Sequence, residues 1–95
     1  MVTHVVLWKF KPGTEAEQER FLSGLKGLLG VVPEIKTQEI HRSAVENSEF
    51  DALLICTFES MEALNAYKVD PRHVAVANIC KEIRTVRSAF DFEES

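Results

Sequence analysis

The chain is poor in the residues that build metal centres and disulfide frameworks. Its 95 residues include two cysteines and three histidines. Cys56 and Cys80 lie far apart without a C-x-x-C spacing, which favours reduced, buried thiols over a disulfide or a zinc site. The scattered histidines give no metal-ligand spacing either. The sequence therefore predicts a protein without a metal ion or another cofactor.

Long apolar runs and dense basic runs are missing as well. No segment approaches the length of a membrane span, and the N-terminus shows a strand pattern in place of a charged region with a cleavage site. The formal net charge is −4, and the 11 basic residues are scattered. These features argue against membrane and nucleic acid as partners and predict a cytoplasmic location.

Hydrophobic periodicity predicts seven elements in a single domain that spans residues 1–95. Alternation favours strands at 3–11, 35–42, 51–59 and 84–93, and helical spacing favours helices at 15–29, 61–69 and 71–83. This β-α-β-β-α-(α)-β order is typical of an α+β, ferredoxin-like fold. We therefore expect a four-stranded antiparallel sheet with helices on one face.

The helix ends carry recognisable signals. Thr14 opens a capping-box pattern at the first helix, and Gly30 is the expected end of that helix. Ser60 suits the N-cap of the second helix. Asp70 and Pro71 suit the N-cap and the first position of the third, because a proline lacks the N–H that would have no intrahelical partner there.

The predicted sheet is apolar on both faces. In strand 3–11, alternate residues from His4 to Phe10 share one face, and the residues between them share the other. Helices can cover only the first face. So large an exposed apolar patch is unusual for a soluble monomer, so we expect two copies to form a homodimer through this surface. The uncovered face carries Val5, Leu7, Leu53 and Ile55.

The segment 67–74 places a tyrosine and a histidine where two helices meet. His73 falls in the first turn of the third helix and shares a face with positions 76, 77 and 80, so it is predicted to point inward. His4 is also a polar group among apolar neighbours, and a buried imidazole needs a hydrogen-bond partner. Two interpretations stay open: structural histidines, or a site in which His73 and Tyr67 carry protons.

Four segments stand out in order along the chain: His4-Val5-Val6-Leu7-Trp8-Lys9-Phe10-Lys11, Thr57-Phe58-Glu59-Ser60, Tyr67 to Val74 with Asp70-Pro71-x-His73, and Phe90-Asp91-Phe92. In this order and spacing they resemble the stress-responsive α/β-barrel domain (Dabb) family of the dimeric α/β-barrel superfamily. The resemblance covers nearly the whole chain. It implies a homodimer in which two sheets face each other as a barrel, which agrees with the apolar second face.

The resemblance also implies a site. A plant cyclase of this family closes a linear poly-β-keto thioester by aldol condensation with a histidine and a tyrosine, which match His73 and Tyr67. A histidine that lines its pocket matches His4. Another pocket tyrosine of that cyclase falls near Leu25, where this chain differs, so its substrate is not carried over.

The leading hypothesis is a homodimer with a pocket for a small apolar carbonyl compound. His73 and Tyr67 are the predicted catalytic residues of cofactor-free acid/base chemistry of the cyclase, aldol or enolisation type, which needs a base and a donor for the oxyanion. The alternatives are a non-catalytic dimeric stress-response or ligand-binding protein and a cofactor-independent oxygenase. The predicted substrate-binding residues are His4, Val6, Trp8, Leu54, Cys56 and Phe58.

Overall fold

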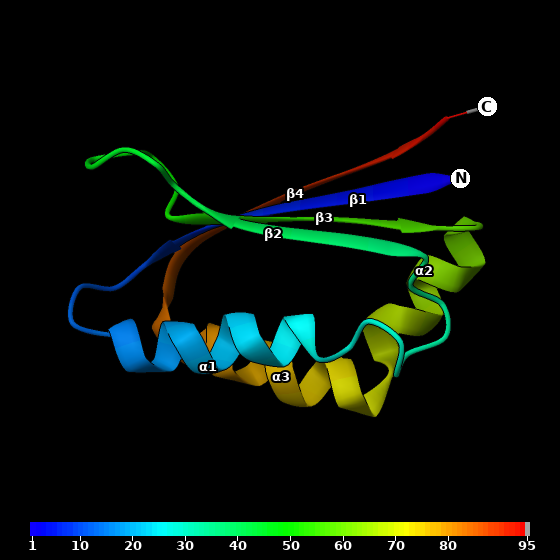
Figure 1. The fold of residues 1–95 in the computed structure, drawn as a ribbon, viewed down its shortest axis with the longest axis horizontal. Coiled ribbons are helices and arrows are strands. Elements are labelled where there is room, and N and C mark those ends of the chain that lie inside the picture. Colours follow the sequence, from blue (N-terminus) through cyan, green and yellow to red (C-terminus); the bar gives the residue numbers. More distant parts are fainter. Residues whose placement is uncertain (95) are drawn as a thin grey trace.

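The computed structural model describes residues 1–94 and contains a four-stranded antiparallel sheet with three helices (Figure 1). The sheet order is β2-β3-β1-β4. The predicted element order and ferredoxin-like α+β fold are confirmed. The elements are β1 (Val2–Phe10), α1 (Glu15–Lys26), β2 (Thr37–Arg42), β3 (Ala52–Phe58), α2 (Met61–Val69), α3 (Pro71–Ile83) and β4 (Arg84–Glu93).

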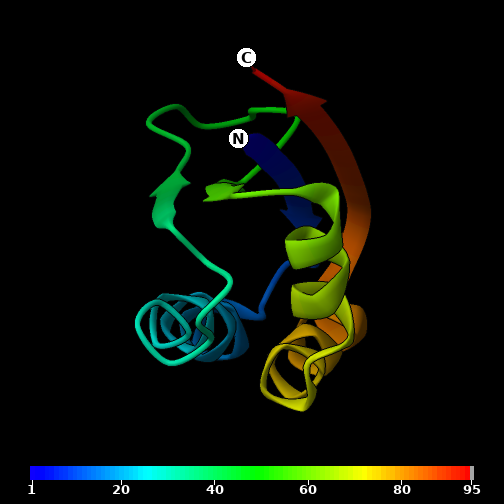
Figure 2. The ribbon, with the colours of Figure 1, turned by 90° about the vertical axis from the view of Figure 1, so that its right-hand side faces the viewer.

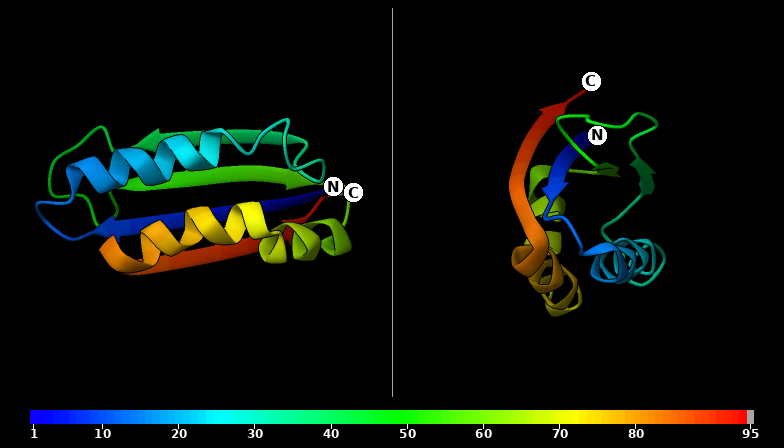
Figure 3. Two further views of the ribbon diagram at one scale, coloured as in Figure 1. Left: turned by 90° about the horizontal axis from the view of Figure 1, so that it is seen from below. Right: turned by 90° about the vertical axis from the view of Figure 1, so that its left-hand side faces the viewer.

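All three helices lie on one side of the sheet (Figures 1 and 2). Seen from that side, α1 runs over β2 and β3, and α3 runs along β4 (Figure 3). The two helices come close at Gly24, where an added Cβ would lie 3.1 Å from both methyl carbons of Val76. The absence of a side chain at Gly24 therefore permits the close packing of α1 on α3.

The core lies between the helices and the inner face of the sheet. β1 is central because it pairs with both β3 and β4. Its even-numbered residues from Val2 to Phe10 are all buried, as the alternation predicted. Trp8 and Phe10 meet Phe21 of α1 edge to face, with ring centroids 4.9 and 6.2 Å apart. These rings fill one end of the core.

No helix of residues 1–94 covers the opposite face of the sheet (Figure 2). Val5 pairs there with Ile55 on one side and Phe90 on the other, and Leu7 pairs with Leu53. These aliphatic residues are half-buried, and Phe90 is 68% exposed. β4 thus extends the uncovered apolar face that the sequence predicted.

Two predictions for the first helix were wrong in detail. Thr14 is the N-cap residue, but its side chain makes no capping bond, because its hydroxyl donates to the Lys11 carbonyl at 2.6 Å instead. The helix ends at Lys26 and not at 29. Gly24 and Gly27 both weaken helix propensity there. A series of turns follows, up to Gly30 with φ +85°.

The caps of the other two helices are confirmed. The Ser60 hydroxyl accepts from the Ala63 N–H at 3.1 Å, and the Asp70 carboxylate accepts from the Arg72 N–H at 2.8 Å. β2 starts at Thr37, two residues later than predicted. In the described part of the chain, no helix is long and apolar enough to cross a membrane.

Replacing Ser60 with alanine should lower the free energy of unfolding by about 1 kcal/mol, because the Ala63 N–H loses its acceptor. Urea denaturation followed by circular dichroism measures this. Ser23→Ala is the matched control, since Ser23 is an exposed residue inside α1. Equal stability of the Ser60→Ala variant and the parent would show that this cap contributes nothing.

Candidate active site

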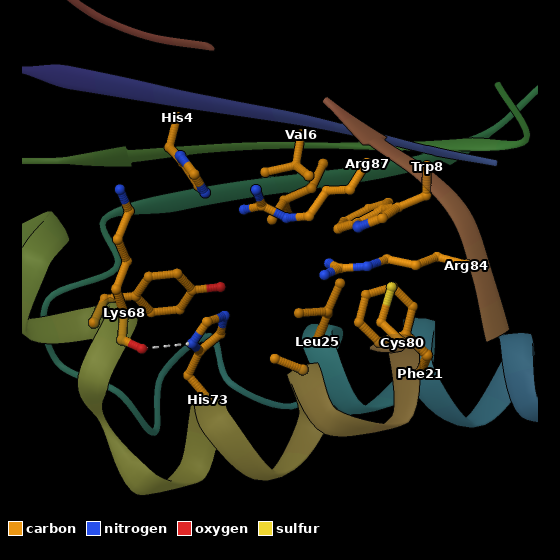
Figure 4. A pocket seen from close by; sticks show the side chains of 13 residues that line it. His4, Val6, Trp8, Phe21, Leu25, Lys68, His73, Cys80, Arg84 and Arg87 are labelled. Carbon is orange, nitrogen blue, oxygen red and sulfur yellow. Dashed lines mark hydrogen bonds between the residues drawn. The ribbon is translucent and has the colours of Figure 1, made fainter. Parts of the chain in front are cut away.

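A cavity of about 60 Å³ lies between the sheet and the helices (Figure 4). It brings together both predicted catalytic residues, Tyr67 and His73, and four of the six predicted binding residues. Cys56 and Phe58 are the exceptions: they are completely buried and do not line the space. The lining residues are His4, Val6, Trp8, Phe21, Leu25, Leu54, Tyr67, Lys68, His73, Ala77, Cys80, Arg84 and Arg87.

His4 meets its hydrogen-bonding requirement through Asp91. The β1–β4 register places these two residues opposite each other, and the Asp91 carboxylate accepts from the His4 Nδ1–H. In this tautomer His4 Nε2 is an acceptor. Burial lowers the pKa of His4, although Asp91 opposes that shift. His4 is therefore a neutral imidazole in the wall of the cavity at neutral pH.

Asp91 balances two effects. Burial acts to raise the pKa of its carboxyl, but the hydrogen bond from His4 and the nearby Lys68 ammonium outweigh burial, so the pKa lies below its ordinary value. Lys68 Nζ lies 3.6 Å from the carboxylate. Asp91 thus stays ionised and can hold His4 in one tautomer and one orientation.

His73 is placed by the helix junction. Asp70 and Pro71 start α3, so His73 falls in its first turn and points into the cavity, as predicted (Figure 4). Its Nδ1–H donates to the Lys68 carbonyl at 3.2 Å, which leaves Nε2 as the proton acceptor. Burial lowers the pKa of His73. The imidazole is therefore neutral at pH 7 and able to take up a proton.

Tyr67 contributes a hydroxyl without a partner. Its side chain is 1% exposed, and its ring lies 4.2 Å from the His73 ring and 5.1 Å from Phe58, between centroids. Among residues 1–94, no group hydrogen-bonds to its hydroxyl. Every side-chain oxygen or nitrogen that is completely inaccessible does have a partner, so the Tyr67 hydroxyl is not completely inaccessible. The hydroxyl must therefore reach the cavity. Burial raises the pKa of Tyr67, so the hydroxyl stays protonated and can donate.

The cationic part of the lining was missed by the sequence reasoning. Lys68, Arg84 and Arg87 reach the cavity, and all three are labelled in Figure 4. A signal existed for Arg87, because the alternation of β4 places it on the same face as Asp91. The prediction of a small apolar carbonyl ligand rested on the apolar residues of β1 and β3 together with Tyr67 and His73, and it did not include the cations at this edge of the sheet.

The cavity is small in this conformation. An apolar protein cavity of about 150 Å³ accommodates benzene, whereas the space here is about 60 Å³. Trp8 forms one end without closing the space, and Leu25, at the position where the resemblance places a tyrosine, is part of an apolar wall. A ligand of only a few heavy atoms fits without side-chain movement.

Metal-binding clusters are not found in the described residues: no three His, Cys, Asp or Glu side chains gather closely enough. Both cysteines are free and buried. Burial raises the pKa of Cys56 to about 12 and that of Cys80 to about 11, so both remain neutral thiols at neutral pH. The groups that can move protons near pH 7 are therefore the imidazoles.

Residues 2–94 match the model of the stress responsive A/B barrel domain. The chain belongs to this family. The match confirms the resemblance drawn from the sequence.

Individual relatives agree with this assignment. Olivetolic acid cyclase of Cannabis sativa is 25% identical over 95 residues, covering 96% of this chain and 94% of the cyclase. A dimeric protein of unknown function with a ferredoxin-like fold from Bacteroides fragilis has a TM-score of 0.90 at 21% identity, over 98% of this chain and 95% of that one. Hydroxynitrile lyase of Passiflora edulis has a TM-score of 0.86 at 14% identity, over 99% and 93% of the two chains. The last two establish a common fold.

The protein should lose stability as the pH falls below about 6.5. Burial lowers the folded-state pKa of both His4 and His73. On acidification these histidines therefore take up protons first in the unfolded chain, and this shifts the folding equilibrium toward the unfolded state. The free energy of unfolding should therefore increase with pH through this window and level off above it. Urea titrations between pH 5 and 8 measure the slope.

His73→Gln should reduce this slope, because it removes one of the two buried imidazoles. His41→Gln is the matched control, since it removes an exposed imidazole outside the cavity. A parent protein with the same stability at pH 5.5 and pH 7.5 would contradict the assigned protonation states.

Proposed function

We propose that this protein is a homodimer in which each cavity binds a small carbonyl compound and catalyses proton transfer on it without a cofactor. One observation carries the proposal: a protonated, unpartnered Tyr67 hydroxyl and the acceptor nitrogen of His73 meet at one cavity. A tyrosine hydroxyl that faces a cavity and is not used by another side chain is free to donate a hydrogen bond to a ligand there. The likeness to a cyclase supports the same class of chemistry.

The proposed step is enolisation. His73 Nε2 removes a proton from the carbon next to the carbonyl, and the electron pair of that C–H bond forms the enolate double bond. The carbonyl π electrons move to oxygen, where the Tyr67 hydroxyl donates a hydrogen bond. Transfer of the proton from His73 to a different carbon of a conjugated enolate completes an isomerisation. Alternatively, the enolate carbon attacks a second carbonyl within the substrate, and the alkoxide that forms takes up the proton from His73 to complete an aldol closure. No oxidant or reductant is consumed.

His4 and Asp91 form a second proton-accepting pair in the same wall. The His4 and Tyr67 ring centroids are 6.4 Å apart. In the proposal His4 relays the proton or binds the substrate, and His73 is the base because its ring lies closer to Tyr67. The alternative is a non-catalytic binding protein, which is favoured by the fact that both imidazoles already have a partner for Nδ1.

His73→Ala should reduce turnover about 100-fold or more, because it removes the general base, while the melting temperature changes little. The assay is deuterium incorporation next to the carbonyl of hydroxyacetone and of levulinate in D₂O, followed by proton NMR. Tyr67→Phe should also slow exchange but keep full stability, since the deleted hydroxyl has no partner in the folded chain. The matched control is His41→Ala.

Two results together would contradict catalysis. One is the absence of enzyme-dependent exchange in the parent across such a panel. The other is a large loss of stability in His73→Ala, which is the behaviour of a structural histidine that leaves a buried partner unpaired. The dimeric binding protein would then be the better description.

The proposed homodimer uses the uncovered face of the sheet. Leu7→Lys should dissociate it, because the dimer would have to bury an unpaired charge beside Leu53. Sedimentation equilibrium measures the mass. Val45→Lys is the matched control, since Val45 is an exposed aliphatic residue outside the sheet. A parent chain that is monomeric at micromolar concentration would remove the barrel interpretation.

A further inference from the structure

Positive charge gathers at the opening of the cavity, although the protein as a whole is acidic. We call this opening the mouth; its cationic side chains are Lys68, Lys81, Arg84 and Arg87. A hollow of about 250 Å³ lies directly outside the cavity and shares Lys68, His73, Ala77, Arg84 and Arg87 with it. Lys81 adds a fourth cationic side chain to this outer hollow. Among the described residues that line either space there is no aspartate or glutamate, although the chain carries a net charge of −4.

The two arginines of this mouth differ from Arg42 and Arg72 in having no carboxylate partner among the described residues. Arg42 and Arg72 each pair with a carboxylate at 2.8 Å, with Glu19 and Asp70 respectively. Arg84 and Arg87 make no ion pair with any residue of the described chain. Lys68, another cation of the mouth, does have a carboxylate nearby: its Nζ lies 3.6 Å from Oδ2 of Asp91. Two planar guanidinium groups are therefore available for an anion from solution.

Both guanidinium groups point into the space that holds the proton-transfer groups. Figure 4 shows both side chains extending from β4 into this space, with Arg84 between Trp8 and Cys80 and Arg87 near Val6. The positive charge of Arg87 is close enough to act against protonation of both His4 and His73. An anion held by these arginines would thus lie next to the imidazoles.

We propose that the ligand of this cavity is a short oxo carboxylate, with its carboxylate between Arg84 and Arg87 and its carbonyl toward Tyr67 and His73. The inference rests on the proposed function, because it names the substrate class of the same cavity. Guanidinium groups bind carboxylates in a bidentate geometry that a neutral ketone cannot satisfy. The apolar walls formed by Val6, Leu25 and Leu54 then take the short carbon chain.

The mouth stays available in the proposed dimer. It is formed by α2, α3 and β4 on the helix side of the sheet, whereas the homodimer uses the opposite face (Figures 2 and 3). Burying the open face therefore leaves the arginines free to receive a ligand. The inner cavity takes the carbonyl end of a short acid, and the outer hollow, which shares both arginines with it, takes the remaining atoms of the ligand.

Trp8 offers a direct test, because it is the chain's one tryptophan and lines the cavity. Its fluorescence is titrated with levulinate, its neutral methyl ester and valerate, which lacks the oxo group. Levulinate should bind about tenfold or more tightly than the methyl ester, because a charged hydrogen-bond pair is worth this much. Valerate should bind more weakly than levulinate, because it offers Tyr67 no carbonyl.

Arg87→Gln and Arg84→Gln should each remove most of the preference for levulinate over its methyl ester, because loss of a guanidinium weakens binding of the carboxylate far more than binding of the neutral ester. Arg20→Gln is the matched control, since it removes one exposed positive charge from α1, away from the mouth. Circular dichroism confirms that each variant is folded. Loss of the preference in both mouth variants and its retention in the control is the supporting result.

Four results would overturn the inference: equal affinity for levulinate and its methyl ester, an unchanged preference in both mouth variants, valerate binding as well as levulinate, or inorganic phosphate displacing levulinate at equal concentration. Deuterium exchange separates this failure from that of the proposed function. Exchange that depends on His73 but shows no preference for the carboxylate would leave enolisation standing. Arginine-dependent binding without exchange would leave a binding protein for oxo acids.

Discussion

The hydrogen bond between His4 and Asp91 determines much of what this fold can do. An imidazole in the central strand of a buried sheet face must have a partner, and only the antiparallel register of β4 on β1 brings one. The same bond fixes the tautomer of His4, so that Nε2 is a neutral acceptor. A structural requirement of the sheet therefore creates a proton-accepting position in the wall of the cavity, next to the apolar side chains of β1 and β3.

On the other side of the cavity, the junction between α2 and α3 fixes the position and the tautomer of His73. Pro71 starts a new helix where α2 ends, and the Lys68 carbonyl left free at the end of α2 takes the Nδ1–H of His73. This interruption between the two helices thus sets both the position and the tautomer of His73. Tyr67 lies in the last turn of α2, and its hydroxyl is not used by another residue. The proposed base and oxyanion donor are held by backbone geometry, which explains how so short a chain can align them.

The sequence was sufficient for the fold and for the imidazoles, because both follow from local rules. Alternation in β1 separates His4 from Val5, and the Asp70-Pro71 signal places His73 within its helix. Cavity lining was harder to predict. Cys56 and Phe58 share a face with Leu54, yet they lie beyond the end of the space, because periodicity gives the face of a residue and not its neighbours in the next layer. The role of Arg87 depends on where the edge strand lies relative to α3, and that packing has no signature in a single sequence.

The proposed dimer and the proposed proton transfer use opposite faces of β1. Its odd-numbered residues lie on the uncovered face, where the proposed dimer forms, and its even-numbered residues face the core, where His4, Val6 and Trp8 line the cavity. Because the side chains alternate strictly, a substitution such as one at Leu7 changes the first surface without entering the second. The cationic mouth lies at the far edge, beside β4 and α3, where neither the core nor the dimer needs charge. Arg84 and Arg87 make no ion pair with the described residues at that edge, so the carboxylate of the proposed ligand would be the anion that they lack.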